Sequence, residues 1–273
     1  IGADNVDKVK AMKDNYKWMK LDCLITLGGN GTHKTAKMLS DEGLNIIGLP
    51  KTIDNDIWGT DVTFGFSTAC DTATEVIDRL HTTADSHGRV MVVELMGNKA
   101  GWLTLQSGIA GGADVVLIPE IPYDIERVIK AVEARKAKKK SFSIIAVAEG
   151  AQTKEEAAQK RKDRQPSDNP YRTVAHRIAE TVQQRTGLEA RAVIPGHIQR
   201  GGSPSPYDRV LSTEFGVHAA KLIADDVYGV TVAIIGCEVG HNALSDVGGK
   251  TKLVTEGHPL VSTAKSIGIE LGG

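Results

Sequence analysis

Short apolar runs alternate with helical stretches along most of this chain. The runs are rich in β-branched residues and cover residues 21–27, 45–49, 89–95, 115–119, 142–148, 191–194 and 230–236. The clearest helical stretches are residues 33–42, 68–84, 123–138, 171–186 and 208–227. Strands that alternate with helices predict parallel sheets covered on both faces and joined by right-handed crossovers. We therefore expect an α/β fold with two three-layer lobes and mostly parallel sheets.

The composition limits the partners and the location of the protein. Lysine and arginine number 33 and aspartate and glutamate 34, so a net charge of −1 gives no overall field that favours nucleic acid or an anionic membrane. Three cysteines far apart in the sequence argue against a disulfide framework and fit a reducing compartment. No apolar stretch approaches the roughly 20 residues that span a bilayer, and the first residues lack the features of a signal peptide. We expect a cytoplasmic protein that binds neither nucleic acid nor a membrane.

A glycine-rich turn follows the first apolar run. It consists of Gly28, Gly29, Asn30, Gly31 and Thr32. Glycines permit the close backbone approach that lets N–H groups contact phosphate oxygens at the start of a helix. The alternative is a tight strand-to-helix turn in which Thr32 is the N-cap. The turn does not match the P-loop pattern, and by itself it leaves both interpretations open.

Two aspartates follow the second apolar run. Asp54 and Asp56 come shortly after residues 45–49, where the carboxyl end of a strand would meet the glycine turn at one edge of a sheet. Two such carboxylates repel each other unless a cation or a substrate hydroxyl lies between them. They could divide proton abstraction from magnesium binding, as phosphoryl transfer to an alcohol requires. A hydrophilic turn is the alternative.

Cationic side chains gather near a third set of glycines and prolines. His197 and Arg200 lie within residues 195–204, with Arg191 just upstream, and Arg89 opens another apolar run. Arginines can hold a sugar phosphate through paired hydrogen bonds, although any single one of them is better explained as a surface arginine in a weak ion pair. Glu149 ends a further run, where it could accept hydrogen bonds from sugar hydroxyls or simply begin a loop.

Taken in order, these motifs resemble the 6-phosphofructokinase family. The matching segments are Gly-Gly-Asn-Gly-Thr at 28–32, Pro-Lys-Thr-Ile-Asp-Asn-Asp at 50–56, Glu-Leu-Met-Gly at 94–97, Gly-Ile-Ala-Gly-Gly-Ala-Asp at 108–114 and Gly-His-Ile-Gln-Arg-Gly-Gly-Ser-Pro at 196–204. The likeness continues through Gly-Lys-Thr-Lys at 249–252. It implies a two-lobed α/β fold, a homo-tetramer or homo-dimer, and transfer of a phosphoryl group from ATP to O1 of fructose 6-phosphate, which gives fructose 1,6-bisphosphate.

The resemblance also assigns roles to single residues. It implies that Asp54 is the base on the 1-hydroxyl, that Thr52 positions the substrate, and that Asp56 and Asn30 lie on the Mg²⁺ side. The residues implied to bind the donor are Gly28, Gly29, Asn30, Gly31, Thr32 and Lys51. The residues implied to line the sugar phosphate pocket are Met96, Gly97, Glu149, His197 and Arg200. Arg89 and Arg191 match positions that reach fructose 6-phosphate from a neighbouring subunit.

The family uses either ATP or inorganic pyrophosphate as donor, and this chain carries marks of both. Gly31 resembles the ATP users, because the missing side chain leaves room for the α-phosphate where pyrophosphate users place an aspartate. Lys51 resembles the pyrophosphate users. A carboxylate would clash with and repel an α-phosphate, whereas an ammonium only adds attraction, so we favour ATP and keep pyrophosphate as the alternative. A non-catalytic sugar-phosphate-binding subunit is the third possibility, suggested by Asn30 and by Asn98 where relatives often have aspartate and arginine.

The resemblance implies how the lobes are built from the sequence. Residues 1–65 with 199–249 would form the donor-binding and catalytic lobe, and residues 66–198 with 250–273 the lobe that binds fructose 6-phosphate. The family's first strand, its glycine-rich loop and an arginine that bridges the two substrates precede the matching region and do not occur in this sequence. We therefore expect these 273 residues alone to be far less active than a chain that has those parts.

Overall fold

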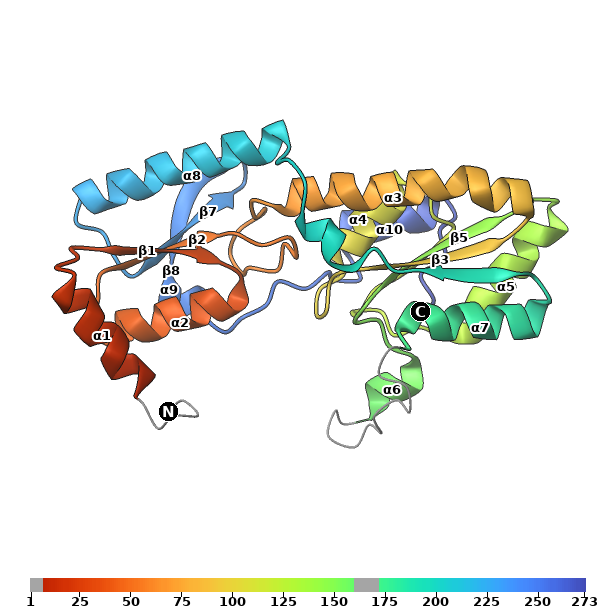
Figure 1. Cartoon of the computed structure of the whole chain (residues 1–273), viewed down its shortest axis with the longest axis horizontal. Helices are drawn as coiled ribbons and strands as arrows, with labels where there is room; N and C mark the ends of the chain where they lie inside the picture. Colours follow the sequence, from red (N-terminus) through yellow and green to blue (C-terminus); the bar gives the residue numbers. More distant parts are fainter. Residues whose placement is uncertain (1–6, 160–171) are drawn as a thin grey trace. The chain divides into compact units, whose positions relative to one another are not determined.

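The chain forms two compact units, which are described one at a time. A computed structural model describes residues 7–159 and 172–273, so residues 1–6 of the expected first lobe and residue 171 of an expected helix lie outside it. Unit 1 is Ile1–Phe66 with Pro206–Lys252, and unit 2 is Ser67–Ser205 with Leu253–Gly273. Each unit contains one four-stranded sheet (Figure 1). The chain passes between units after residues 66, 205 and 252, where the sequence had suggested 65, 198 and 249.

The sheet of unit 1 has the strand order β1-β2-β7-β8. Its strands are β1 (Leu24–Gly28), β2 (Ile46–Pro50), β7 (Val230–Ile235) and β8 (Glu238–Ala243). The first three are parallel, and β8 runs antiparallel to β7. The helices are α1 (Lys8–Trp18), α2 (Asn30–Asp41), α8 (Pro206–Ala224) and α9 (Leu244–Val247).

Strand β2 is buried on both of its faces, because helices cover the two sides of the sheet. Ile46 packs with Leu39 of α2, whereas Ile47 belongs to a separate core with Phe215 of α8. Successive side chains of a strand point to opposite faces, which explains why neighbouring isoleucines enter different cores. Figure 1 shows α8 and α2 on opposite sides of this sheet. The expected layering is therefore present in unit 1.

The sheet of unit 2 is wholly parallel and has the order β4-β5-β3-β6. Its strands are β3 (Val90–Leu95), β4 (Val115–Leu117), β5 (Ser143–Ala148) and β6 (Ala190–Val193). The helices are α3 (Phe66–His87), α4 (Trp102–Ala110), α5 (Ile125–Ala137), α6 (Lys154–Ala158), α7 (Val174–Thr186) and α10 (Pro259–Ser266). A short 3₁₀ helix, η2, covers Gly196–Arg200.

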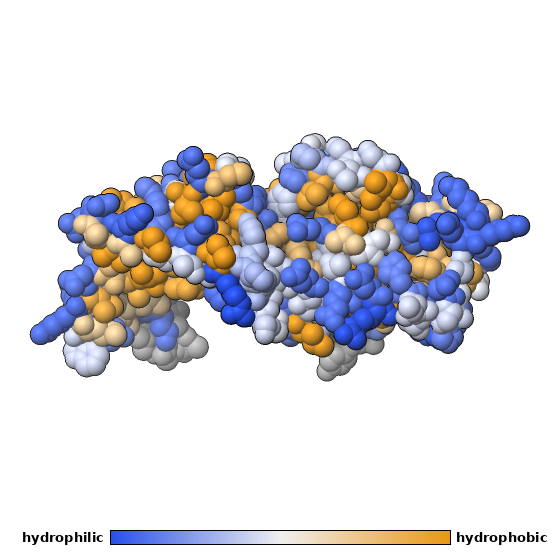
Figure 2. Space-filling model, turned by 90° about the horizontal axis from the view of Figure 1, so that it is seen from above, coloured by the Kyte–Doolittle hydropathy of each residue, from blue (hydrophilic) through white to orange (hydrophobic). Residues whose placement is uncertain are grey.

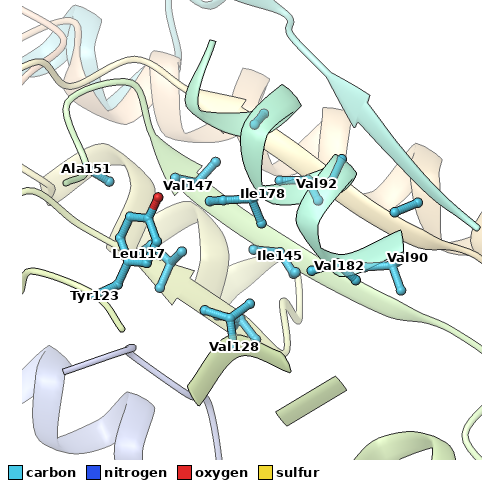
Figure 3. Packing of buried hydrophobic residues seen from close by; sticks show 14 of the residues in the cluster. Val90, Val92, Leu117, Tyr123, Val128, Ile145, Val147, Ala151, Ile178 and Val182 are labelled. Atoms are coloured by element: carbon cyan, nitrogen blue, oxygen red, sulfur yellow. The ribbon is translucent and has the colours of Figure 1, made fainter. Parts of the chain in front are cut away.

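A hydrophobic core lies between this sheet and helices α5 and α7 (Figure 3). Alternate residues of β3, Val90 and Val92, contribute to it from the sheet side. Val128 enters from α5, and Ile178 and Val182 enter from α7. All five side chains are almost fully excluded from water, and burial of such apolar side chains is the main force that stabilises a unit of this size.

The polar strand β8 was missed by the sequence analysis. Its residues include Gly240, His241 and Asn242, and none of its positions is fully buried, so it lacks the apolar run that marks the other strands. The two-residue turn that joins it to β7 has positive φ at Gly236 (63°) and Cys237 (85°), as tight hairpin turns require. In the described part of the chain, no helix is both long and apolar enough to cross a bilayer.

Candidate active site

The glycine turn lies between β1 and α2 in unit 1. Strand β1 ends at Gly28, and Gly29 is the N-cap of α2, with φ −89° and ψ −161°. A Cβ atom on Gly28 would overlap the Thr32 side chain, whereas a Cβ on Gly31 would meet nothing within 4 Å. The alternative with Thr32 as N-cap is wrong, because α2 starts at Asn30. The turn thus presents a helix N-terminus, where N–H groups and the helix dipole favour an anion.

The acidic loop lies directly beside the glycine turn. Parallel pairing of β1 and β2 puts Gly28 opposite Pro50, and the Lys51 N–H donates to the Gly28 carbonyl at 3.1 Å. From the first residue of α2, Asn30 Nδ2 donates to Asp56 Oδ2 at 2.6 Å and to the Asp56 carbonyl at 3.2 Å. The two motifs that follow successive strands therefore form one site within unit 1.

A buried asparagine holds the loop between the two aspartates. Asn55 is 5 % exposed and has a positive φ of 50°, which asparagine tolerates better than most residues. Its Oδ1 accepts from the Thr63 N–H at 3.0 Å. Thr52 Oγ1 accepts from the Asp54 N–H at 3.2 Å, so Thr52 fixes the start of the same turn. The sequence analysis gave no role to Asn55, although its place between two aspartates in a turn was a usable signal.

Asn30 has an unsatisfied oxygen that fits a metal ligand. Its Oδ1 is buried and has no hydrogen-bond partner among the described residues. The amide cannot be turned around without loss, because Nδ2 already donates to two acceptors on Asp56. Buried polar atoms without a partner are rare, and a missing ion is one of their causes. Amide and carboxylate oxygens are ligands that Mg²⁺ takes, so Asn30 and Asp56 fit this ion.

A half-buried lysine, Lys252, fixes the backbone that follows Asp56. The Lys252 N–H donates to the Asp56 carbonyl at 2.8 Å, and its Nζ donates to the carbonyls of Thr60 and Asp61 at 2.8 and 2.9 Å. Burial lowers the pKa of Lys252 to about 8, against the raising effect of the nearby carboxylates. The sequence analysis included Lys252 only as part of a matching segment, because lysine is usually an exposed residue.

A histidine inside α2 connects the glycine turn to the centre of the sheet. His33 is 1 % exposed, and its Nδ1 lies 3.1 Å from the Gly29 carbonyl oxygen. Since that oxygen can only accept, Nδ1 donates. Nε2 lies 2.9 Å from Thr231 Oγ1, whose single O–H is also within 3.1 Å of the Gly48 carbonyl oxygen. Burial lowers the pKa of His33. A neutral imidazole with a contact at each ring nitrogen therefore links the Gly29 carbonyl, at the start of α2, to strand β7.

Several residues expected to bind the sugar phosphate lie together in unit 2. Strands β3 and β5 end in register, and the Glu149 N–H donates to the Leu95 carbonyl at 2.8 Å. The adjacent Met96 N–H donates to Gln199 Oε1 at 3.1 Å, which attaches η2 to the end of β3. Gln199 is 1 % exposed, whereas His197 and Arg200 on the same short helix are exposed. Gln199 is a positioning residue that the sequence analysis did not single out.

Gly97 follows Met96 and has a backbone that only glycine adopts readily. Its φ is 126°, and a Cβ there would press against the Ala100 carbonyl. Gly97 therefore turns the chain sharply away from the end of β3. Met96 and Gly97, both buried, lie at the carboxyl edge of the sheet, which is where α/β proteins bind ligands.

The two remaining arginines lie at the other end of the same sheet. Arg89 precedes β3 and Arg191 is in β6, and both contact Glu189. Arg89 Nε lies 2.8 Å from Glu189 Oε2. The hydrogen bond from Arg89 is the largest cause of a lowered pKa at Glu189. Within unit 2, Arg89 and Arg191 are therefore grouped with each other and not with Met96. Glu189, which holds the pair, was missed by the sequence analysis.

The expected site residues divide cleanly between the two units. Those expected to bind the donor, the metal and the reacting hydroxyl all lie in unit 1, and those expected to bind the sugar phosphate all lie in unit 2. In unit 1 the combination is a helix N-terminus beside two carboxylates and an unsatisfied amide oxygen, at the carboxyl edge of a parallel sheet. These are the parts of an α/β phosphotransferase.

Comparison with known proteins agrees with this class. Residues 3–223 match the family model described as phosphofructokinase. The chain is 52 % identical over 267 residues to the ATP-dependent 6-phosphofructokinase of Spirochaeta thermophila, covering 97 % of this chain and 73 % of that protein. It is 48 % identical to ATP-dependent 6-phosphofructokinase 3 of Bacteroides thetaiotaomicron, covering 98 % and 75 %. The chain belongs to the phosphofructokinase family.

Solved structures share the fold. The pyrophosphate-dependent phosphofructokinase of Nitrosospira multiformis superposes with a TM-score of 0.80 at 22 % identity, covering 98 % of this chain and 73 % of that one. Phosphofructokinase from Saccharomyces cerevisiae gives a TM-score of 0.73 at 29 % identity, covering 87 % and 34 %. The expected α/β, phosphofructokinase-like fold is confirmed.

Proposed function

We propose that the protein transfers a phosphoryl group from ATP to O1 of fructose 6-phosphate and so acts as an ATP-dependent 6-phosphofructokinase. The observation that carries this proposal is the contact of Asn30 with Asp56, which joins the glycine turn and the acidic loop into one site. Phosphoryl transfer needs an anion cradle, a place for a cation and a base for the hydroxyl proton, and the two loops offer all three.

Each part of unit 1 has a task in this proposal. The N-terminus of α2 binds donor phosphate through backbone N–H groups, with Lys51 as a nearby cation. Asp54 accepts the proton of the 1-hydroxyl, and Thr52, which binds the Asp54 N–H, orients it. Asn30 and Asp56 would hold Mg²⁺, which supplies positive charge to the phosphoryl oxygens when it is bound.

ATP is the donor that the site accommodates best. The open space at Gly31 leaves room beside the start of α2 for a nucleotide, where a larger side chain would stand in the way. The relatives at 48–52 % identity carry names that specify ATP. The neighbour named as pyrophosphate-dependent is only 22 % identical, and it bears on the fold alone.

In this proposal, unit 2 binds the sugar phosphate. Met96, Gly97 and Glu149 stand at the carboxyl ends of β3 and β5, and η2 presents His197 and Arg200 beside them. Arg89 and Arg191 lie at the other end of the sheet. This position is consistent with their binding fructose 6-phosphate in the site of a neighbouring subunit of a homo-tetramer or homo-dimer. A cytoplasmic location is also proposed, since three cysteines far apart in the sequence fit a reducing compartment.

The test is the substitution Asp54→Ser. We expect turnover to fall by several orders of magnitude while fructose 6-phosphate binding, measured by calorimetry, stays nearly unchanged, because the base acts on the reaction and not on the sugar phosphate. Asp225→Ser, at an exposed aspartate of unit 1, is the matched control and should keep full turnover. Assays with ATP and with pyrophosphate run in parallel. Retained turnover in Asp54→Ser, or activity of the unsubstituted protein with pyrophosphate alone, would contradict the proposal.

A further inference from the structure

A glutamate of unit 2 holds two parts of the chain that are far apart in the sequence. Glu120 comes shortly after β4 and is half-buried. The Gly101 N–H donates to both of its carboxylate oxygens, at 3.0 and 3.1 Å, and the Val254 N–H donates to Oε1 at 2.9 Å. Burial is the largest cause of a raised pKa of Glu120, and these hydrogen bonds act in the opposite direction.

The first of these contacts fixes the loop beside the proposed sugar phosphate residues. The loop runs from Gly97 to Gly101, which is the N-cap of α4. An N–H group at the start of a helix is a favourable donor to a carboxylate, because the helix dipole adds to the attraction. A Cβ atom on Gly101 would overlap Ile118 and the Glu120 carboxylate. The far end of the loop is therefore held tightly against Glu120.

The second contact fixes the chain where it enters unit 2 after residue 252. Val254 is 3 % exposed, and the His258 ring that follows it packs edge-to-face on Trp102 of α4, with the centroids 4.9 Å apart. Leu253 is 46 % exposed. Figure 2 shows apolar side chains interspersed with polar ones over the surface, so a single exposed leucine needs no partner. The entering chain is therefore attached to unit 2 through Glu120 and α4.

Two residues before Val254, the same segment is anchored in unit 1. The Lys252 N–H donates to the Asp56 carbonyl, and Lys252 Nζ donates to the carbonyls of Thr60 and Asp61. An extended chain spans at most about 3.3–3.6 Å per residue, so the Cα atoms of residues 252 and 254 stay within about 7 Å of each other. A displacement of Val254 is therefore passed to the loop of Asp56 with little slack.

We propose that Glu120 is a positioning residue that links two loops of the proposed function. Through residues 252–254 it sets the loop that carries Asp56 in unit 1. Through Gly101 it sets the loop that starts at Gly97 in unit 2. The identity of the ligands, Mg²⁺ and fructose 6-phosphate, rests on the proposed function, whereas the link between the loops does not.

Amide hydrogen exchange of Glu120→Ala tests the link without turnover. We expect faster exchange at residues 97–104 of unit 2 and also at residues 54–64 of unit 1, because loss of the carboxylate frees the segment that holds Asp56. Glu120→Gln keeps one acceptor oxygen and should give a smaller increase in both places. Glu256→Ala, at an exposed glutamate of the same segment, is the matched control and should leave both unchanged.

Unchanged exchange at residues 54–64 in Glu120→Ala would overturn the proposal and leave Glu120 as a local support of α4. The urea midpoint of each variant checks that it is folded under the conditions of the experiment. If Glu120→Ala is not folded, the comparison of Glu120→Gln with Glu256→Ala decides the question in the same way.

Ligand binding gives a second readout. In Glu120→Ala we expect calorimetry to show fructose 6-phosphate binding weakened by about threefold or more, and the Mg²⁺ concentration for half-maximal activity to rise similarly, with little change in kcat. Adding Lys252→Met should raise the Mg²⁺ requirement no further, since both changes break one connection, and additive effects would overturn the link. Absence of fructose 6-phosphate binding in the unsubstituted protein would instead contradict the proposed function, and the exchange experiment would still decide the link.

Discussion

Neighbouring glycines of the turn in unit 1 obey different constraints. Gly28 is packed so closely against Thr32 that no Cβ fits, whereas Gly31 faces open space and has no backbone that requires glycine. The packing of the folded chain therefore requires glycine at position 28. For Gly31 the fold gives no such reason, which is consistent with the donor-binding role proposed for it. The resemblance had already given Gly31 a role of its own in donor choice, but sequence reasoning could not detect the packing against Thr32 that requires glycine at position 28.

We expect Gly31→Asp to raise the KM for ATP by about tenfold or more, because a carboxylate at the start of α2 would repel the donor phosphates. Stability should hold, since the new side chain enters open space and an acidic residue in the first helical turn is favourable. Steady-state kinetics with varied ATP measure the effect. Gly31→Asn has nearly the same size without the charge, and an equal rise in KM for both variants would show that bulk, not charge, is responsible.

The buried imidazole of His33 makes stability depend on pH. Its pKa is lowered in the folded protein, so folded and unfolded forms are both neutral above the ordinary value of about 6.5. Below that value the unfolded chain takes up a proton that the folded one resists, and stability falls by up to about 1.4 kcal/mol per pH unit until the folded pKa is reached. The effect is therefore absent at pH 7.5 and present at pH 5.5.

We expect His33→Gln to be less stable than the unsubstituted protein at pH 7.5, because the Gly29 and Thr231 contacts are weakened. Between pH 7.5 and 5.5 the variant should lose less stability than the unsubstituted protein does, since it has no imidazole at this position to protonate. Urea unfolding at the two pH values gives both quantities. If the two proteins lose the same free energy of unfolding between the two pH values, His33 is not the source of the pH dependence.

At the level of elements, the apolar strands could be predicted from the sequence, whereas the polar strand β8 could not. The buried strands β2, β3 and β5 lie within or close to the ranges that the sequence suggested, because a continuous apolar run leaves few alternatives. Strand β8 carries no such run. It is a strand because β7 offers a free edge and a tight turn of Gly236 and Cys237 folds the chain back. Such tertiary causes cannot be read from local sequence.

The candidate site shows the same division. Asp54 and Asp56 could be identified from the sequence, because two carboxylates at the end of a buried strand repel each other unless a cation or a substrate hydroxyl lies between them. Gln199 and Glu189, which hold the short helix η2 and the arginine pair, gave no comparable signal, and the only signal for Asn55 was its place between the two aspartates. Their partners are distant in the sequence or depend on a turn that only the fold reveals, so residues that position others were found only in the structure.

We expect Lys252→Met to loosen the loop that follows Asp56. The substitution keeps an apolar stem but leaves the carbonyls of Thr60 and Asp61 without the ammonium donor, which should lower the free energy of unfolding by about 1–3 kcal/mol. The Mg²⁺ concentration for half-maximal activity should rise, because the loop carries a proposed ligand. Lys250→Met, at an exposed lysine of the same segment, is the control. Identical unfolding and Mg²⁺ curves for the two variants would contradict this role.

At the level of the whole molecule, the positions of Arg89 and Arg191 raise the question of a second subunit. They meet at Glu189, at the opposite end of β3 from Met96. One chain is therefore not expected to use all of its sugar-phosphate residues in one site. An active site shared between subunits would make activity depend on assembly.

Mixed oligomers can test the shared site. Asp54→Ser and Arg191→Ala should each be nearly inactive alone, but mixing the two after reversible dissociation should restore part of the activity, since some sites then combine an intact aspartate with an intact arginine. Turnover of the mixture is the measurement. Asp54→Ser mixed with Asp56→Ser damages the same side of the site and should recover nothing. No recovery in the first mixture, despite proven exchange of subunits, would place Arg191 in its own chain's site.

The discontinuous build of unit 1 affects how the protein emerges from the ribosome. All four strands of unit 2 are complete once residue 193 has been made, whereas β2 of unit 1 must wait for β7, which begins at residue 230. Translation proceeds at about 5–20 residues per second, so the sheet of unit 1 stays incomplete for several seconds after the strands of unit 2 have been made. Until β7 is made, the edge of β2 that pairs with it is therefore an unpaired strand edge, and such edges favour aggregation.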